Sequence, residues 1–140
     1  MEYRHYWKIE YEIPLYAFKR IQAKAAEFAQ QSYSDVSIAI NTHPEYLSLY
    51  ISGVHEESQD TFLLTPGIRN YDYCNTAHKP YDEVVVAVLN YAGHNYLKWW
   101  SDGDSSDHFK GMSIYTGTNL PYHYTCSEEP EELVKKRAAT

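Results

Sequence analysis

The stretch from Glu83 to Tyr96 constrains the fold more than any other part of the chain. Pro80, just ahead of it, suits the first turn of a helix, where its missing N–H costs nothing. Asp82 and Glu83 complement the positive end of such a helix. A V-V-V-A-V run is also typical of a buried strand, but the length and the N-terminal signals favour a buried helix. One broad face carries the apolar residues Val84, Val85, Val88, Leu89, Ala92 and Tyr96.

The rest of the chain reads as strands and one further helix. Pro14 opens a helix that runs through Ser32, with apolar residues recurring at threes and fours. Two-residue alternation or short apolar runs predict strands over residues 7–13, 36–40, 46–52, 61–65, 97–100 and 112–116. The segment from Ile68 to Lys79 has no period. We therefore expect an α+β fold, with a mainly antiparallel sheet of four to six strands and two helices on one face.

The length of 140 residues fits one domain, which we place at residues 1–126. Residues 127–140 form a tail that is acidic and then basic, read as a short helix or a frayed end. The N-terminus has no apolar signal core, and the longest uncharged apolar run is too short for a membrane span. Two cysteines, far apart in sequence, predict free thiols in a reducing compartment. These features predict a cytoplasmic protein that does not enter a membrane.

Tyrosine is unusually frequent, with 15 Tyr and 3 Trp against 4 Phe. Such side chains suit half-buried positions and interfaces, so a protein partner is expected, although they could simply cover the edge of a small core. The net charge of -7, without a basic cluster of the size that phosphates require, disfavours direct nucleic-acid binding. Homo-oligomers stay possible.

Polar side chains crowd the approach to the predicted buried helix. Unpaired N–H groups at a helix N-terminus attract anions, so this loop and the S-D-G turn could bind a polar ligand such as a nucleotide. The same residues could equally serve only to cap the helix. Lys79 and Asp102 can share a site only if the strand after the helix runs back alongside it. The candidate ligand-binding residues are Asn75, Thr76, His78, Lys79, Tyr81, Asp82, Ser101 and Asp102.

Catalytic and metal signatures are weak. The stretch from Ser101 to Asp107 faintly resembles a calcium loop but lacks the required glycine and the closing glutamate. The seven histidines show no paired zinc spacing, so no metal and no cofactor is predicted. Cys74 could act as a nucleophile with His78 four residues on, but no orienting third group is evident. The sequence assigns no catalytic residue, which leaves enzymatic activity open and favours a non-enzymatic role.

The run C-N-T-A-H-K-P-Y-D-E-V-V-V-A-V-L at Cys74 to Leu89, followed by S-D-G at Ser101 to Gly103, resembles small uncharacterised proteins of bacteriophage and prophage genomes. In those proteins an N-T-x-x-K-P-Y-D-like stretch precedes a hydrophobic helix, and an S-D-G follows. The resemblance implies a phage setting, and hence the host cytoplasm, but no activity.

Three functions remain open from the sequence. The first is a non-catalytic protein that binds a host or phage protein as an inhibitor or modulator. The second is a small-ligand module or small enzyme that uses the loop at residues 75–82. The third is a virion or assembly component, although the chain has no heptads or repeats to support it.

Overall fold

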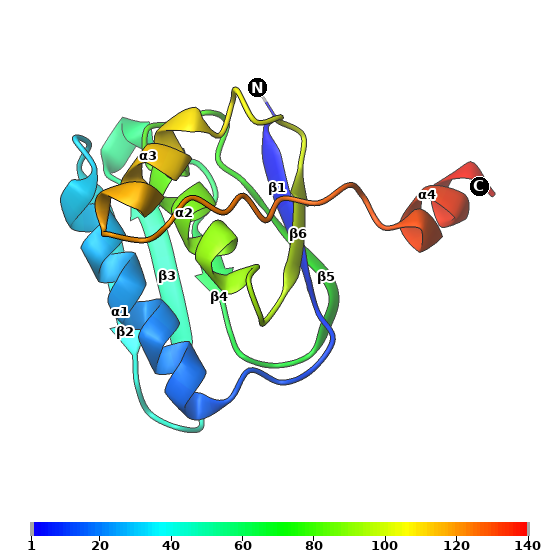
Figure 1. The fold of residues 1–140 in the computed structure, drawn as a ribbon, viewed down its shortest axis with the longest axis horizontal. Coiled ribbons are helices and arrows are strands. Elements are labelled where there is room, and N and C mark those ends of the chain that lie inside the picture. The colour runs from blue at the N-terminus through cyan, green and yellow to red at the C-terminus, as the bar shows by residue number, and fades with distance from the viewer. Residues whose placement is uncertain (1, 140) are drawn as a thin grey trace.

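In the computed structural model, which describes residues 2–139, the protein is an α+β domain, as the sequence predicts. Its six strands form two antiparallel sheets of three strands, in the orders β5-β1-β6 and β2-β3-β4 (Figure 1). The strands are β1 (Arg4–Ile9), β2 (Val36–Asn41), β3 (Ser48–Gly53), β4 (Phe62–Leu64), β5 (Arg69–Asn75) and β6 (Lys98–Ser101). The helices are α1 (Leu15–Gln31), α2 (Asp82–Ala92), α3 (Phe109–Gly117) and α4 (Glu131–Ala138), with a 3-10 turn at His55–Glu57.

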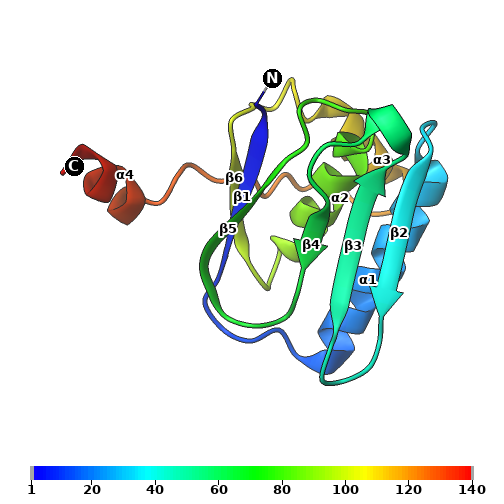
Figure 2. The ribbon, with the colours of Figure 1, turned by 180° about the vertical axis from the view of Figure 1, so that it is seen from behind.

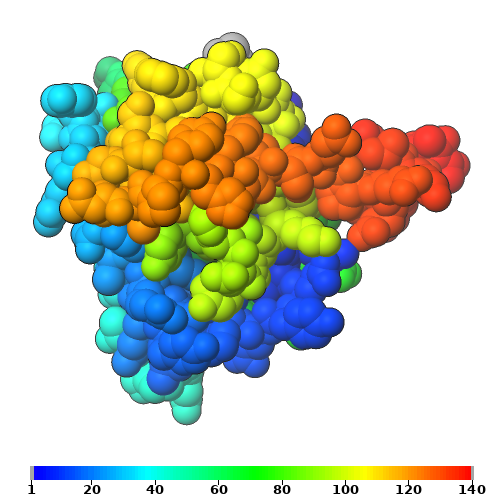
Figure 3. Space-filling view, viewed as in Figure 1, coloured from blue at the N-terminus to red at the C-terminus, as the bar shows by residue number. Residues whose placement is uncertain are grey.

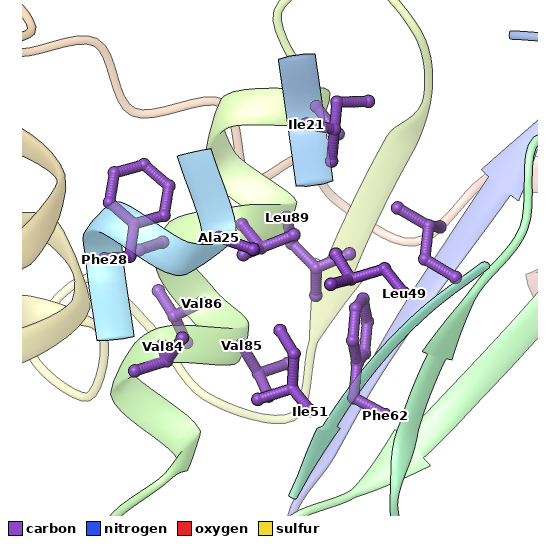
Figure 4. Packing of buried hydrophobic residues seen from close by; sticks show 14 of the residues in the cluster. Ile21, Ala25, Phe28, Leu49, Ile51, Phe62, Val84, Val85, Val86 and Leu89 are labelled. Carbon is purple, nitrogen blue, oxygen red and sulfur yellow. The ribbon is translucent and has the colours of Figure 1, made fainter. Parts of the chain in front are cut away.

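Helix α2 is the centre of the core, and the prediction of a buried helix here is confirmed. Asp82 and Glu83 lie in its first turn, and all residues from Val84 to Asn90 are buried. Its side chains meet α1 and the inner face of β2-β3-β4, where Val85 lies near Ile51 (Figure 4). Seen from behind, the two sheets lie on one side of the molecule and α1, α2 and α3 on the other (Figure 2).

The prediction of a strand at residues 112–116 is wrong, because this segment belongs to α3. Its buried residues follow helical spacing, and Gly111 lets α3 approach α2 closely. A Cβ atom at Gly111 would lie 2.5 Å from Cγ1 of Val86. The physical reason for the helix is therefore a tight helix-to-helix contact, which local alternation does not encode.

The first strand begins earlier than predicted, and another strand lies where no period was visible. β1 ends at Ile9, and Tyr11 beyond it is 81% exposed. β5 occupies a segment that we predicted to be irregular. This strand shows no apolar period because only Cys74 of its side chains is buried. β1 pairs with both β5 and β6, which are distant in sequence.

The C-terminal tail runs beside β6 and then leaves the rest of the molecule (Figures 1 and 3). The backbone N–H of Ser127 donates to the carbonyl oxygen of Trp99 at 2.8 Å. None of the residues of α4 is buried. No helix within residues 2–139 is long and apolar enough to cross a membrane.

Candidate functional site

A chain of polar side chains lies inside the protein where β1, β6, α2 and α3 meet. In the strand register His5 sits between Cys74 of β5 and Ser101 of β6, on the inner face of the sheet. His5 and His108 are both fully buried. The indole of Trp99 lies beside both imidazoles, with ring centroids 6.1 Å from His5 and 5.2 Å from His108. These two histidines are thus held in apolar surroundings.

Hydrogen bonds join six side chains into one network, which we call the polar cluster. Nε2 of His5 lies 2.5 Å from Oδ1 of Asp82, and the Thr76 hydroxyl donates to the same oxygen at 2.5 Å. Nδ1 of His5 lies 2.9 Å from Oγ of Ser101. That Oγ lies 3.1 Å from Nε2 of His108, whose Nδ1 is 2.6 Å from the Tyr124 hydroxyl. The polar cluster therefore consists of Thr76, Asp82, His5, Ser101, His108 and Tyr124.

One arrangement of protons satisfies the contacts among these six side chains when both imidazoles are neutral and Asp82 is ionised. His5 then donates from Nε2 to Asp82 and accepts at Nδ1 from the Ser101 hydroxyl. Oγ of Ser101 accepts from Nε2 of His108, which accepts at Nδ1 from the Tyr124 hydroxyl. This assignment rests on donor and acceptor matching. In this arrangement the hydrogen bonds all donate in the same direction, from Tyr124 toward Asp82.

The electrostatics agree with an ionised Asp82 and a neutral His108. Burial raises the pKa of Asp82, but the hydrogen bonds from His5 and Thr76 outweigh burial, and the net pKa is lower than usual. Burial lowers the pKa of His108 to about 4, so this ring is neutral at pH 7. Burial raises the pKa of Tyr124, which keeps its hydroxyl a donor.

His5, Asp82 and Ser101 are the residue types of a serine hydrolase triad, but their environment favours a structural role. Oγ of Ser101 accepts from the backbone N–H of Gly103 at 3.0 Å as well as from His108. Both of its lone pairs are therefore engaged, and its proton goes to His5. A nucleophile needs an oxygen that is open to substrate. The polar cluster instead fixes the ends of β6, α2 and α3 relative to β1.

The Tyr3 hydroxyl lies at the edge of the polar cluster. It is buried beside Gly103, where a Cβ atom would lie 2.1 Å from this oxygen. Among residues 2–139 it has no hydrogen-bond partner of normal geometry. Its ring stacks on His78 with centroids 3.5 Å apart. Tyr3 therefore links the loop before α2 to the turn after β6.

Three of the eight predicted site residues meet in the polar cluster, namely Thr76, Asp82 and Ser101. Sequence reasoning missed His5, His108 and Tyr124, which complete it. The alternation of Trp7 and Ile9 extends back to His5, so the two-residue period could have placed His5 on the buried face. No local signal marks His108 or Tyr124.

The other predicted residues serve the loop itself. Oδ1 of Asn75 accepts from the backbone N–H of Tyr3 at 2.9 Å and of Ala77 at 3.0 Å. Ala77 and His78 both have positive φ, at 51° and 58°, in a turn closed by the N–H of Lys79 and the carbonyl of Thr76 at 2.9 Å. Such a backbone is strained for residues other than glycine and is held by its surroundings.

Lys79 and Asp102 line different grooves. Lys79 borders a groove of about 440 Å³ with Asp82 and Lys110, at the starts of α2 and α3. Asp102 lines a larger groove of about 760 Å³ beside the C-terminal tail. Oδ2 of Asp102 accepts from the backbone N–H of Arg4 at 2.9 Å, which ties the end of β6 to β1.

Tyr81 and Cys74 are interior groups. The Tyr81 hydroxyl donates to the carbonyl of Asp60 at 2.5 Å. Burial raises the pKa of the Cys74 thiol to about 12, so it stays protonated and is a poor nucleophile. Within the described chain, residues 2–139, no group of three His, Cys, Asp or Glu could hold a metal ion.

The outer face of β5-β1-β6 carries a second constellation, which we call the aromatic face: Arg4, Tyr6, Tyr71, Tyr73 and Trp100. Tyr6 stacks on Trp100, with ring centroids 5.8 Å apart and planes 9° apart. The guanidinium of Arg4 lies over the Tyr73 ring at 5.1 Å. Tyr71 and Tyr73 are 51% and 48% exposed, whereas Trp100 is buried. The face is therefore large, rigid and partly open to solvent.

No protein-family model, curated protein or solved structure matches this chain.

Proposed function

We propose that this protein is a non-catalytic binding protein that uses the aromatic face to hold another protein. The observation that carries the proposal is the exposure of Tyr71 and Tyr73 beside the Tyr6 and Trp100 stack. Tyr, Trp and Arg are enriched at protein interfaces, and they dominate the binding energy there. Their rings offer contact area while losing little conformational freedom.

The polar cluster supports this role from the opposite side of the same sheet. His5 and Tyr6 are neighbours on β1 and point to opposite faces. The network that fixes His5 therefore also holds the strand that presents Tyr6. A preorganised surface loses less freedom on binding.

The setting that we propose is the cytoplasm of a bacterial host, with a host or phage protein as the partner. The resemblance of Cys74 to Gly103 to phage proteins supports this choice. Inhibition or redirection of the partner fits a small chain in which the hydrogen-bonded Ser101 and the buried Cys74 are poor nucleophiles.

A second candidate is a small-ligand module, favoured by the groove at Lys79 and Lys110. The carboxylates of Asp82, Glu83 and Asp107 also line this groove and would repel an anion. Several predicted ligand residues are engaged elsewhere, as the contacts of Asn75 and Asp102 illustrate. Protein binding is therefore the better supported function.

Affinity capture from a host lysate tests the proposal. The wild type and a Tyr71→Ala/Tyr73→Ala variant are compared, with Tyr50→Ala as the matched control, because Tyr50 is 41% exposed on the other sheet. We expect one partner that the wild type and Tyr50→Ala retain and the double variant loses. A small molecule that copurifies with all three, with no partner lost by the double variant, would contradict the proposal.

A further inference from the structure

Helix α4 stands beside the aromatic face and contacts it through few side chains. Nζ of Lys8 lies 2.7 Å from Oε1 of Glu132. Leu133 lines the groove of about 760 Å³ that also contains Tyr6, Tyr71 and Trp100. The N–H and hydroxyl of Ser127 both donate to the carbonyl of Trp99, at 2.8 and 3.0 Å, and anchor the start of the tail. The chain's own tail thus forms one wall of this groove.

The attachment beyond Ser127 is weak. None of the eight residues of α4 is buried, and Val134 is 42% exposed. A helix this short is marginal in water without packing. The side chain of Glu132 is 65% exposed, so its ion pair with Lys8 contributes little. Helix α4 can therefore leave the face without disturbing the core.

The chemistry of this contact indicates what the face accepts. The carboxylate of Glu132 meets the ammonium of Lys8 on β1. Lys136 and Arg137 of α4 line the groove together with Asp102 of the turn after β6. Beside it, the aliphatic side chain of Leu133 faces the groove with the rings of Tyr6 and Trp100. A carboxylate next to an apolar side chain on a short helix is a common form of groove recognition.

We propose that α4 occupies in cis the docking surface for a helical segment of the partner that carries a carboxylate next to a leucine, and that α4 must leave before the partner binds. This inference rests on the proposed function and specifies the partner's chemistry. The tail acts as a competitor, so the apparent affinity for the partner is the intrinsic affinity multiplied by the fraction of molecules in which α4 is undocked.

The test uses the full chain and a labelled peptide of residues 127–139 as the probe, followed by fluorescence anisotropy. Glu132→Lys places a lysine against Lys8 and should release α4. Glu131→Lys is the matched control, because it makes the same charge change in the same turn but Glu131 pairs with Lys135 within the helix, at 3.4 Å. We expect Glu132→Lys to bind the peptide about threefold more tightly than the wild type and Glu131→Lys, because the ion pair that it breaks is exposed.

A charge exchange checks that the peptide uses the same contact. Lys8→Glu should bind the wild-type peptide weakly and bind a peptide carrying Glu132→Lys more tightly. Equal binding of the wild-type peptide by all chains, or binding by none, would overturn the proposal. A wild type that has the mass of two chains while Glu132→Lys has the mass of one would also overturn it, because α4 would then dock on a second copy.

The two proposals can fail separately. The peptide experiment contains no host protein, so it can succeed when lysate capture returns nothing. Capture that depends on Tyr71 and Tyr73, together with a peptide that binds no variant, would support the proposed binding function. It would contradict the proposed competition by α4.

Discussion

The two sheets have the same size and the same antiparallel pairing, yet their faces differ in chemistry. The inner face of β2-β3-β4 is apolar, with Leu49, Ile51 and Phe62 fully buried. The inner face of β5-β1-β6 leads into the polar cluster at His5 and Ser101. One sheet therefore contributes mainly apolar burial, whereas the other contributes hydrogen bonds that fix the positions of its neighbours.

The outer faces differ as well. On β2-β3-β4 the exposed Tyr50 pairs with Ala39 and Leu63. On β5-β1-β6 the aromatic face joins four rings to an arginine. A hydrogen-bonded interior behind a rigid aromatic exterior is what a binding surface requires. We therefore place the proposed binding surface on the second sheet.

The largest effect is expected in the apolar sheet. Phe62→Ala should lower the free energy of unfolding by about 4 kcal/mol, because it leaves a cavity under β4. Urea unfolding followed by tryptophan fluorescence measures it. Leu63→Ala, on the same strand but 38% exposed, should cost less than about 1 kcal/mol. Similar losses for the two variants would show that the inner face is not the source of stability.

The pH dependence of the free energy of unfolding should come from the polar cluster behind the other sheet. The pKa of His108 is about 4 in the folded protein, against about 6.5 when unfolded. The unfolded state binds more protons between these values, so stability is full above about pH 6.5 and falls as the pH drops to about 4.

The total loss should approach about 3 kcal/mol. Urea unfolding across this range should show a smaller loss for His108→Gln than for the wild type. The remaining slope comes in part from His94, whose pKa burial also lowers. In Phe62→Ala the free energy of unfolding should change with pH as steeply as in the wild type. An unchanged slope in His108→Gln would contradict the placement of a neutral His108 in the polar cluster.

Removing a charge from the polar cluster should lower the free energy of unfolding somewhat less than acidification does. Asp82→Asn should lower the free energy of unfolding by about 2 kcal/mol near neutral pH, because hydrogen bonds to a carboxylate are stronger than those to an amide. The pKa of Asp82 is lower than usual, so its contribution is present above about pH 4 and disappears below it.

Urea unfolding at several pH values measures this difference. The matched control is Asp35→Asn, an exposed carboxylate just before β2, which should change stability by less than about 0.5 kcal/mol. Equal losses in the two variants would mean that the polar cluster does not hold Asp82 as a charged acceptor.

The smallest effect concerns the turn before α2. Ala77→Gly should raise the free energy of unfolding by about 0.5 to 1 kcal/mol, because φ is 51° there and glycine adopts it without strain. Ala39→Gly, in β2 of the other sheet, should lower it by a similar amount. Thermal unfolding compares them. A loss in both variants would show that the turn is not strained.

The sequence predicts those parts of the fold that local patterns determine. Pro80 and Asp82 mark the start of α2, and Pro14 marks the start of α1, as observed. β5 escaped prediction because its Tyr71 and Tyr73 face solvent and give no apolar period. The split into two sheets depends on β1 pairing with strands far along the chain, which local periodicity does not contain.

The candidate site was predictable only where its residues are close in sequence. Thr76 and Asp82 lie within one loop and its helix, so their sequence crowding reflects real proximity. His5 joins them only through the register of β1, and His108 only through the packing of α3. Tyr6, Tyr73 and Trp100 form one surface only because three distant strands are neighbours. The excess of tyrosine predicted such a surface but not its position.

Photocrosslinking in host cells is the most direct test of whether the aromatic face binds a partner protein. A photoreactive phenylalanine replaces Tyr73 on the aromatic face in one chain and Tyr50 on the other sheet in a second chain, since both side chains are about half exposed. The account predicts one discrete crosslinked protein from position 73 and none from position 50. The same product from both positions, or a product from position 50 alone, would contradict it.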